Sequence, residues 1–261
     1  MPEIEHERQR QYRKAEAPLR RGGIGARAAV FGAAGAIGGA LVQALRAHGA
    51  DCVYALSRHA IPANATGVVP VFADILDEAS LAAAAAQIGA HGALDTVMVA
   101  TGQLHAPGIM PEKALREITP EAMATIFAVN CTGPALAMKH FLPLLPRGRP
   151  GRLAVLSARV GSISDNRKGG WYAYRAAKAG LNMVVRSAAI ETARRTPEAM
   201  VVALHPGTVD SALSFPFRGF IAPDQMLAPQ VAAERLVGVI KCLRPEQNGQ
   251  LIAYDGRVIP P

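Results

Sequence analysis

Tyr174 and Lys178 are the residues whose types and spacing point most directly to chemistry, because no other tyrosine in the chain has a lysine four positions later. On a helix, residues four apart lie one above the other on the same face. The pKa of a free phenol is about 10, and a nearby ammonium group stabilises the phenolate and lowers that pKa. The pair is therefore a candidate proton donor and acceptor at a carbonyl or alcohol oxygen, although an ordinary helix surface can show the same spacing.

Three glycines near the start of the chain, Gly32, Gly35 and Gly38, indicate a nucleotide-binding turn between a strand and a helix. Glycines there permit a tight turn, let the backbone approach a pyrophosphate and allow the helix to pack closely on the strand. The first N–H groups of the helix then face the phosphates. The alternative is a membrane span over residues 28–45, which carry no charge. So many glycines and alanines make a poor span.

The composition indicates one α/β domain with a sizeable core and no room for a large second domain, since half of the 261 residues are apolar. The formal net charge is 28 minus 20, or +8, which suits a site that binds phosphates. No Lys/Arg cluster is interleaved with aromatic residues, so we expect no nucleic-acid partner. The three cysteines are scattered without metal spacing, which predicts buried free thiols in a reducing compartment, the cytoplasm, and no metal site.

Short apolar runs alternate with helical patterns after a polar extension over residues 1–25, which we expect to be disordered or loosely attached to a single domain over residues 26–261. The predicted strands are Ala28–Gly32, Cys52–Ser57, Val68–Ala73, Thr96–Thr101, Leu153–Ser157, Met200–Leu204 and Leu251–Tyr254. The predicted helices are Ile37–Ala47, Glu78–Ile88, Pro120–Leu144, Tyr172–Arg195 and Pro229–Leu243. This alternation predicts an α/β fold, a single Rossmann-type doubly wound parallel sheet of about seven strands with helices on both faces.

The segment over residues 211–229 is less regular, carries three prolines and follows a predicted strand. Ligands lie beyond the carboxyl ends of strands in such folds, so we interpret this segment as a lid on the substrate side. A plain surface connection is the alternative.

Together these residues resemble the short-chain dehydrogenase/reductase family, and more narrowly its subgroup of C-factor and sniffer-type carbonyl reductases. The resemblance runs from Ala28 to the end of the chain. Its markers are Gly32–Gly38, Asp74, Asn130, Tyr174, Lys178, the run His205-Pro-Gly-Thr208, and the stretches over residues 156–166 and 169–175.

The resemblance implies a role for each marker. Tyr174 would protonate the carbonyl oxygen as hydride arrives, while Lys178 would lower the pKa of Tyr174 and hold the nicotinamide ribose. Asn130 would hold a water between Lys178 and solvent; alternatively it is a satisfied polar residue inside a helix. Asp74 would contact the adenine, unless it merely caps the next helix, for which Asp77 is better suited. The cofactor contacts predicted in all are Gly32, Gly35, Ala36, Ile37, Gly38, Ser57, Arg58, Asp74, Ile75, Thr101, Gly102, Tyr174, Lys178, Pro206, Gly207 and Thr208.

Two departures from the family pattern bear on the site. The glycine turn has Gly35 one position before the usual place, which here holds Ala36. The serine that polarises the substrate carbonyl normally stands second in a Ser-Ser pair, and this chain has Ser157-Ala158 instead. We predict Ser157 as the catalytic hydroxyl, although strand alternation would turn it to the opposite face. Ser162 is the other donor within reach.

The end of the second strand predicts NADP(H) rather than NAD(H). An acidic residue at that place would bind the ribose 2′-hydroxyl of NAD and repel a 2′-phosphate. The strand ends instead with Ser57-Arg58, which offers a hydroxyl and a guanidinium to that phosphate. The alternative is an arginine in a solvated loop, with NAD(H) still possible.

Three functions are compatible with these residues. The leading one is an NADP-dependent carbonyl reductase, equally an alcohol dehydrogenase, acting on a small molecule. The second is a sugar-nucleotide epimerase or dehydratase, for whose added substrate domain the chain is too short. The third is a nucleotide-binding sensor or signalling protein without turnover, which Ala158 favours. The resemblance implies a homodimer or homotetramer.

Overall fold

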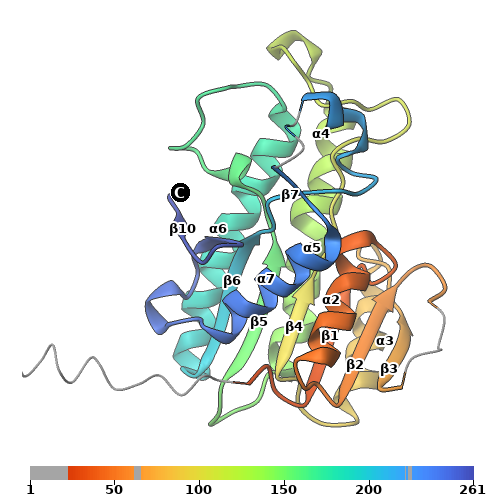
Figure 1. Ribbon diagram of the computed structural model, residues 1–261, viewed down its shortest axis with the longest axis vertical. Coiled ribbons are helices and arrows are strands. Elements are labelled where there is room, and N and C mark those ends of the chain that lie inside the picture. The colour runs from red at the N-terminus through yellow and green to blue at the C-terminus, as the bar shows by residue number, and fades with distance from the viewer. Residues whose placement is uncertain (1–22, 62–65, 221, 223–224) are drawn as a thin grey trace, which may run out of the picture.

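The computed structural model describes residues 23–61, 66–220, 222 and 225–261 (Figure 1). Within this part of the chain, eight strands form one sheet in the order β10-β9-β6-β5-β4-β1-β2-β3. They are β1 (Arg27–Phe31), β2 (Cys52–Ser57), β3 (Val68–Phe72), β4 (Thr96–Val99), β5 (Gly151–Leu156), β6 (Ala199–His205), β9 (Leu251–Ala253) and β10 (Val258–Ile259). All neighbours pair in parallel except β9 and β10. The predicted doubly wound fold is confirmed.

The strand order reverses between β1 and β4, where the chain first runs outward to β3 and then returns to the middle of the sheet. Crevices at such a switch point, beyond the carboxyl ends of the strands, are where ligands bind in open α/β sheets. β4 and β5 are buried at every position, as expected for strands covered on both faces.

Helices cover both faces of the sheet (Figure 1). One face packs against α2 (Ala36–Ala47) and α7 (Pro229–Lys241). The other packs against α3 (Glu78–Gly89), α5 (Gly133–Phe141) and α6 (Tyr172–Arg195). Successive residues of β1 divide between the two cores: Ala29 and Phe31 join one, Ala28 and Val30 the other.

The helix predicted over Pro120–Leu144 is interrupted. It consists of α4 (Pro120–Phe127), a wide π-helical turn over Ala128–Thr132, α5, and a short 3₁₀ turn at Leu142–Leu144. Pro134 accounts for the break, because it has no N–H for the carbonyl four residues earlier and its ring crowds that carbonyl. Gly133 lets the chain come close to Ile75, since a Cβ there would lie 2.7 Å from the Ile75 side chain.

The expected N-terminal extension lies, for residues 1–22, outside the described residues. Residues 23–25 are packed against the domain: Ile24 is buried, its carbonyl accepts from the Thr96 hydroxyl at 2.7 Å, and the Gly23 carbonyl accepts from Arg152 at 3.1 Å. The alternative of a membrane span over residues 28–45 is not realised, because these residues form β1, a turn and most of α2. In the described part of the chain, no helix has the length and apolar character needed to cross a membrane.

The segment over residues 211–229 contains a 3₁₀ turn at Phe215–Phe220 and is closed at its base by a two-stranded pair, β7 (Thr208–Val209) and β8 (Met226–Leu227). This pair and the antiparallel strand β10 were not predicted. The cysteines are free, but Cys52 and Cys131 are half-buried and Cys242 is exposed. The expectation of three buried thiols is therefore wrong, because Cys242 directly follows α7 at the surface.

Candidate active site

The glycine turn between β1 and α2 has the shape that a pyrophosphate needs. Gly32 has a positive φ of 72°, and its carbonyl accepts from the Gly35 N–H at 2.9 Å. A Cβ on Gly38 would lie 2.0 Å from the same carbonyl, so only glycine lets α2 start this close to β1. Gly35 and Ala36 are exposed, and no side chain caps the helix. The N–H groups of the first turn, which includes Ile37, are thus open to an anion.

The end of β2 lies beside this turn, because the Leu56 carbonyl accepts from the Ala33 N–H at 3.1 Å. Ser57 is buried, and its hydroxyl accepts from the His59 N–H at 2.9 Å. The Arg58 side chain is exposed, with its Nε 3.3 Å from His59 Nε2. The guanidinium is therefore available to a phosphate group next to the glycine turn.

Asp74 and Ile75 follow β3 on the same edge of the sheet. The Asp74 carboxylate accepts from the Leu76 N–H at 3.0 Å, whereas Asp77 caps α3 by accepting from the Ala79 N–H at 3.0 Å. The capping role is thus filled by Asp77, which leaves Asp74, half-buried, for the predicted adenine contact. Ile75 is buried under the start of α5.

Tyr174 and Lys178 lie one turn apart on α6, and both are buried, 8% and 2% exposed. The Lys178 ammonium is 5.7 Å from the centre of the Tyr174 ring and donates to the Leu156 carbonyl at 2.9 Å. Burial raises the pKa of Tyr174 and lowers the pKa of Lys178 to about 8. The expected lowering of the Tyr174 pKa by Lys178 stays a prediction, because burial sets the net direction here. Desolvation penalises both charged forms, and the ammonium is directed to a backbone carbonyl.

Asn130 is brought to the same place by the wide turn between α4 and α5. It is fully buried, and its amide nitrogen donates to the carbonyls of Gln103 and Ile126 at 2.6 and 2.9 Å. Its oxygen accepts from the Gln103 N–H at 3.1 Å. The amide thus braces the loop after β4, as the alternative of a satisfied polar residue implies. The water-holding role stays a prediction.

Thr101 and Gly102 belong to that loop. A Cβ on Gly102 would lie 3.5 Å from Asn130 Oδ1 and 3.9 Å from Lys178 Nζ, so the backbone of Gly102 passes directly over both groups. The hydroxyl of Thr101 is buried and has no hydrogen-bond partner among the described residues. An orphaned hydroxyl at this edge is a ready contact for a polar ligand.

Among the described residues, no hydrogen bond links Ser157 to Tyr174. Its hydroxyl donates to Asn182 Oδ1 at 2.7 Å, two helical turns beyond Tyr174 on α6. Ala158 packs against the apolar cluster around Tyr174. Ser162 is buried and its oxygen accepts from the Asp165 N–H at 3.1 Å, so its own proton is uncommitted. The Ser157 proton is already in use, so Ser162 is the one of the two whose hydroxyl can still donate among the described residues.

Pro206, Gly207 and Thr208 follow β6 at the carboxyl edge. Gly207 has a positive φ of 82°, and a Cβ there would lie 2.9 Å from the Tyr254 ring. Thr208 opens the β7–β8 pair that closes the base of the 211–229 segment. Just before them, His205 Nδ1 is buried without a partner among the described residues, and burial lowers its pKa to about 4.

An apolar wall lies around the phenol. Trp171 lies 6.4 Å from the Tyr174 ring and 5.1 Å from the Phe217 ring, measured between ring centres. Leu104 and Leu213 complete the same cluster. Leu213 and Phe217 come from the 211–229 segment, which supports its interpretation as a lid. Trp171 belongs to the stretch over residues 169–175 that marks the family resemblance, whereas Leu104 was not singled out from the sequence.

The residues present fit a dinucleotide. The missing Cβ of Gly38 lets α2 begin directly against the Gly32 carbonyl, which sets the open N–H groups of its first turn beside the glycine turn, and the orphaned Thr101 hydroxyl stands at the edge that leads to Lys178. These places lie along the carboxyl ends of β1, β4 and β5, where the fold places ligands. Gly32, Gly38 and Ile37 would hold the pyrophosphate, and Tyr174 and Lys178 the nicotinamide end.

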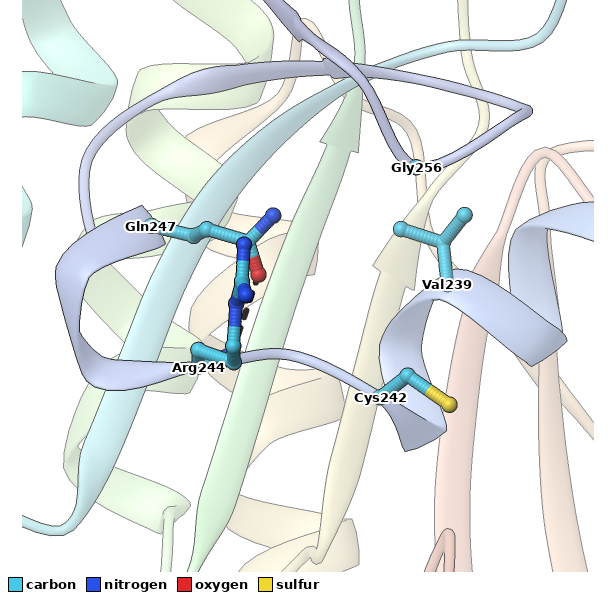
Figure 2. A pocket seen from close by; sticks show the side chains of 5 residues that line it. All are labelled: Val239, Cys242, Arg244, Gln247 and Gly256. Carbon is cyan, nitrogen blue, oxygen red and sulfur yellow. Dashed lines mark hydrogen bonds between the residues drawn. The ribbon is translucent and has the colours of Figure 1, made fainter. Parts of the chain in front are cut away.

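A separate hollow of about 240 Å³ lies between the end of α7 and the turns at its side (Figure 2). It is lined by Val239, Cys242, Arg244, Gln247 and Gly256. None of these is a predicted site residue, and the side-chain oxygen of Gln247 already accepts from the Arg244 N–H at 3.0 Å. The hollow therefore plays no part in the site.

Comparison with known proteins agrees with this geometry. The family model described as short chain dehydrogenase matches residues 26–218. C-signal of Myxococcus xanthus is 36% identical over 147 residues, which cover 56% of this chain and 83% of that protein. The 1-hydroxy-2-glutathionyl-2-methyl-3-butene dehydrogenase of Rhodococcus sp. (strain AD45) is 29% identical over 229 residues, 87% of this chain and 96% of that one.

The fold is also shared with a solved structure. The carbonyl reductase Sniffer of D. melanogaster superposes with a TM-score of 0.78 at 20% identity, over 90% of this chain and 99% of that chain. At this identity the likeness shows the fold, and the resemblance to sniffer-type reductases and C-factor proteins seen in the sequence is confirmed.

Proposed function

The chain belongs to the short-chain dehydrogenase family of nicotinamide-dependent oxidoreductases, and from that premise we propose that it is an NADPH-dependent reductase of ketones or aldehydes. Run in reverse, the same site is an alcohol dehydrogenase. The observation that carries the proposal is the burial of Tyr174 and Lys178 one turn apart on α6, at the edge where Gly102 passes over Lys178. The dehydrogenase and carbonyl reductase names of the similar proteins support the same chemistry.

In this proposal the chain holds the substrate and moves one proton. The cofactor, when bound, supplies the hydride to the carbonyl carbon. Tyr174 gives its phenolic proton to the carbonyl oxygen, which becomes a hydroxyl. Lys178, fixed by the Leu156 carbonyl, places a positive charge near the phenolate that is left. The apolar wall of Trp171 and Phe217 keeps water away and favours a substrate with apolar substituents.

The preference for NADP over NAD rests on the end of β2. Ser57 and Arg58 stand beside the glycine turn, where the adenosine ribose would lie, and no acidic residue is there to bind a free 2′-hydroxyl. An exposed guanidinium forms strong, paired hydrogen bonds with phosphate oxygens.

A sensor without turnover is the second candidate, because two observations favour it. Ala158 removes the hydroxyl that normally polarises the carbonyl, and the Ser157 hydroxyl is committed to Asn182. The similarity to C-signal adds to it. No observation favours the sugar-nucleotide epimerase: the described residues form the eight-stranded sheet with its helices and the short β7–β8 pair, and no added substrate domain is among them.

Steady-state oxidation of NADPH with a panel of aldehydes and ketones separates the candidates. We expect turnover that falls at least about 100-fold in Tyr174→Phe, with NADPH binding retained. Tyr172→Phe, on the same helix two residues earlier, is the matched control and should keep its rate. Cofactor binding by the wild type without turnover on any substrate would establish the sensor instead.

The same panel identifies the hydroxyl that polarises the carbonyl. Ser162→Ala should lower kcat about 10–100-fold if Ser162 fills that role, while Ser157→Ala should act through the position of Asn182 alone and leave kcat within about threefold. The reverse order of effects would return the role to Ser157.

We further propose a homodimer or homotetramer located in the cytoplasm. Met183 and Ile190 on the outer side of α6 are 66% and 45% exposed, which is an apolar surface that an identical partner could cover. The three free cysteines suit a reducing compartment. Light scattering after size exclusion should give twice or four times the chain mass of 27.4 kDa.

A further inference from the structure

Glu112 is a buried acidic residue that forms no ion pair among the described residues. It lies in the long connection between β4 and α4 and is only 4% exposed. Its carboxylate accepts from the Ala173 N–H at 3.2 Å, and its backbone carbonyl accepts from the Trp171 N–H at 2.5 Å. A buried carboxylate needs compensation, and here the N-terminal end of α6 provides it.

The start of α6 depends on this contact because it has no cap of its own. The N-cap residue, Trp171, makes no capping hydrogen bond with its side chain and holds a left-handed backbone, with φ at 53°. It is the one residue other than glycine with positive φ in the described part of the chain. Such a conformation persists only where the surroundings hold it. Glu112 supplies two of the contacts that do so, one from its backbone and one from its carboxylate.

The same turn of helix carries the phenol. Tyr174 follows directly after Ala173, and its ring packs edge-on against Trp171, which in turn packs on Phe217 of the lid. Displacement of the Trp171 backbone would therefore move the wall of the site and the hydroxyl of Tyr174 together. A misplacement of about 1 Å in such groups costs on the order of 100-fold in rate.

We propose that Glu112 is a positioning residue: its carboxylate caps α6 from a distant loop and sets the placement of Trp171 and Tyr174. The catalytic part of this inference rests on the proposed function, because it takes Tyr174 as the proton donor. The geometric part does not, since it concerns only where the first turn of α6 and its tryptophan lie.

Trp171 makes the geometric part measurable without substrate, because it is the only tryptophan in the chain. The experiment compares the wild type with Glu112→Ala, Glu112→Asp and Glu112→Gln by tryptophan emission, acrylamide quenching and steady-state kinetics. Asp95→Asn is the control: Asp95 is 3% exposed and accepts two backbone N–H groups, from Ala26 and Arg27, but it stands at the amino edge of the sheet.

We expect Glu112→Ala to shift the emission to the red and to increase quenching, with kcat lowered about 10–100-fold and the KM for NADPH within about threefold. Glutamine keeps an acceptor oxygen at the same reach, so Glu112→Gln should show wild-type fluorescence and kcat. Aspartate is one methylene shorter, so Glu112→Asp should give values between those of the wild type and Glu112→Ala. Asp95→Asn should lower stability and leave both readouts unchanged. If Glu112→Ala does not fold, the order of glutamine over aspartate carries the same test.

Two results would overturn the inference. One is a Glu112→Ala protein, or in its place Glu112→Asp, that loses stability but keeps the wild-type emission, quenching and kcat. The other is Asp95→Asn that changes the tryptophan signal as much as the Glu112 variants do. A wild type without turnover would refute the proposed function instead. The fluorescence comparison would then still test whether Glu112 sets the placement of Trp171.

Discussion

Gly38→Ala tests the close packing of α2 on the glycine turn more sharply than any other single change. A Cβ at residue 38 would lie 2.0 Å from the Gly32 carbonyl oxygen and 2.6 Å from its carbon. Both atoms are backbone, so no rotamer change can relieve the contact. An ordinary contact of about 3.4 Å would require α2 and the turn to separate by roughly 1.4 Å. The turn resists this, because the Gly32 carbonyl is held by the Gly35 N–H.

The expected cost follows from two opposing terms. Overpacking of this kind destabilises by about 1–3 kcal/mol and sometimes more. Alanine in place of glycine inside a helix raises the unfolding free energy by about 1 kcal/mol. Because the clash is with backbone atoms, which cannot rotate away, the upper end of the first range applies, and Gly38→Ala should lose about 2 kcal/mol of unfolding free energy after that gain. The shifted N–H groups should also weaken NADPH binding about 10–100-fold, the loss of one or two charged hydrogen bonds.

Urea unfolding and NADPH titration measure both effects, and two other glycines serve as controls. A Cβ on Gly39, one residue later, would meet the Ala33 carbonyl at 3.3 Å, a tight but tolerable contact. A Cβ on Gly238 in α7 would meet nothing within 4 Å, so Gly238→Ala should stabilise by about 1 kcal/mol. The expected order of stability is Gly238→Ala, Gly39→Ala, Gly38→Ala. Wild-type stability and NADPH affinity in Gly38→Ala would refute the close approach of α2 to β1.

Three further outcomes follow from charges in the site. Arg58→Glu should raise the Kd for NADPH about 10–100-fold and leave that for NADH within about threefold, by fluorescence titration. Burial lowers the pKa of Lys178 from 10.5 to about 8, so the unfolded chain binds more protons between these values and stability rises with pH. Lys178→Met should remove about 2 kcal/mol of that rise between about pH 7.5 and 9.5 in urea unfolding. Burial likewise lowers the pKa of His205 from 6.5 to about 4, so stability should be lost as pH falls through that window, and less in His205→Gln.

The parts of the fold that local patterns specify were predicted well. β2 and α6 begin and end where the sequence places them, because each is bounded by residues that change the pattern abruptly. Asp77 was the better capping residue for α3, and it fills that role. β10, two residues long, carries too little pattern to be seen.

What the sequence could not supply are contacts between segments far apart. The wide turn that places Asn130 depends on its pairing with Gln103, in a loop that has no regular pattern. Glu112 has an unremarkable place in the sequence, and only the fold brings it to Ala173. The partner of Ser157 is Asn182, which no local rule connects to it.

The spacing of Tyr174 and Lys178 predicted their proximity but not their environment, and the environment sets how readily each group takes its charged form. Burial penalises every charge, so it raises the pKa of Tyr174 and lowers that of Lys178, moving both toward their neutral forms. The phenol therefore keeps its proton at neutral pH. The protonated phenol is the form that can give a proton to a carbonyl oxygen, and the phenolate left after that transfer is the form that can take a proton back from an alcohol, so one pair serves both directions of the proposed reaction.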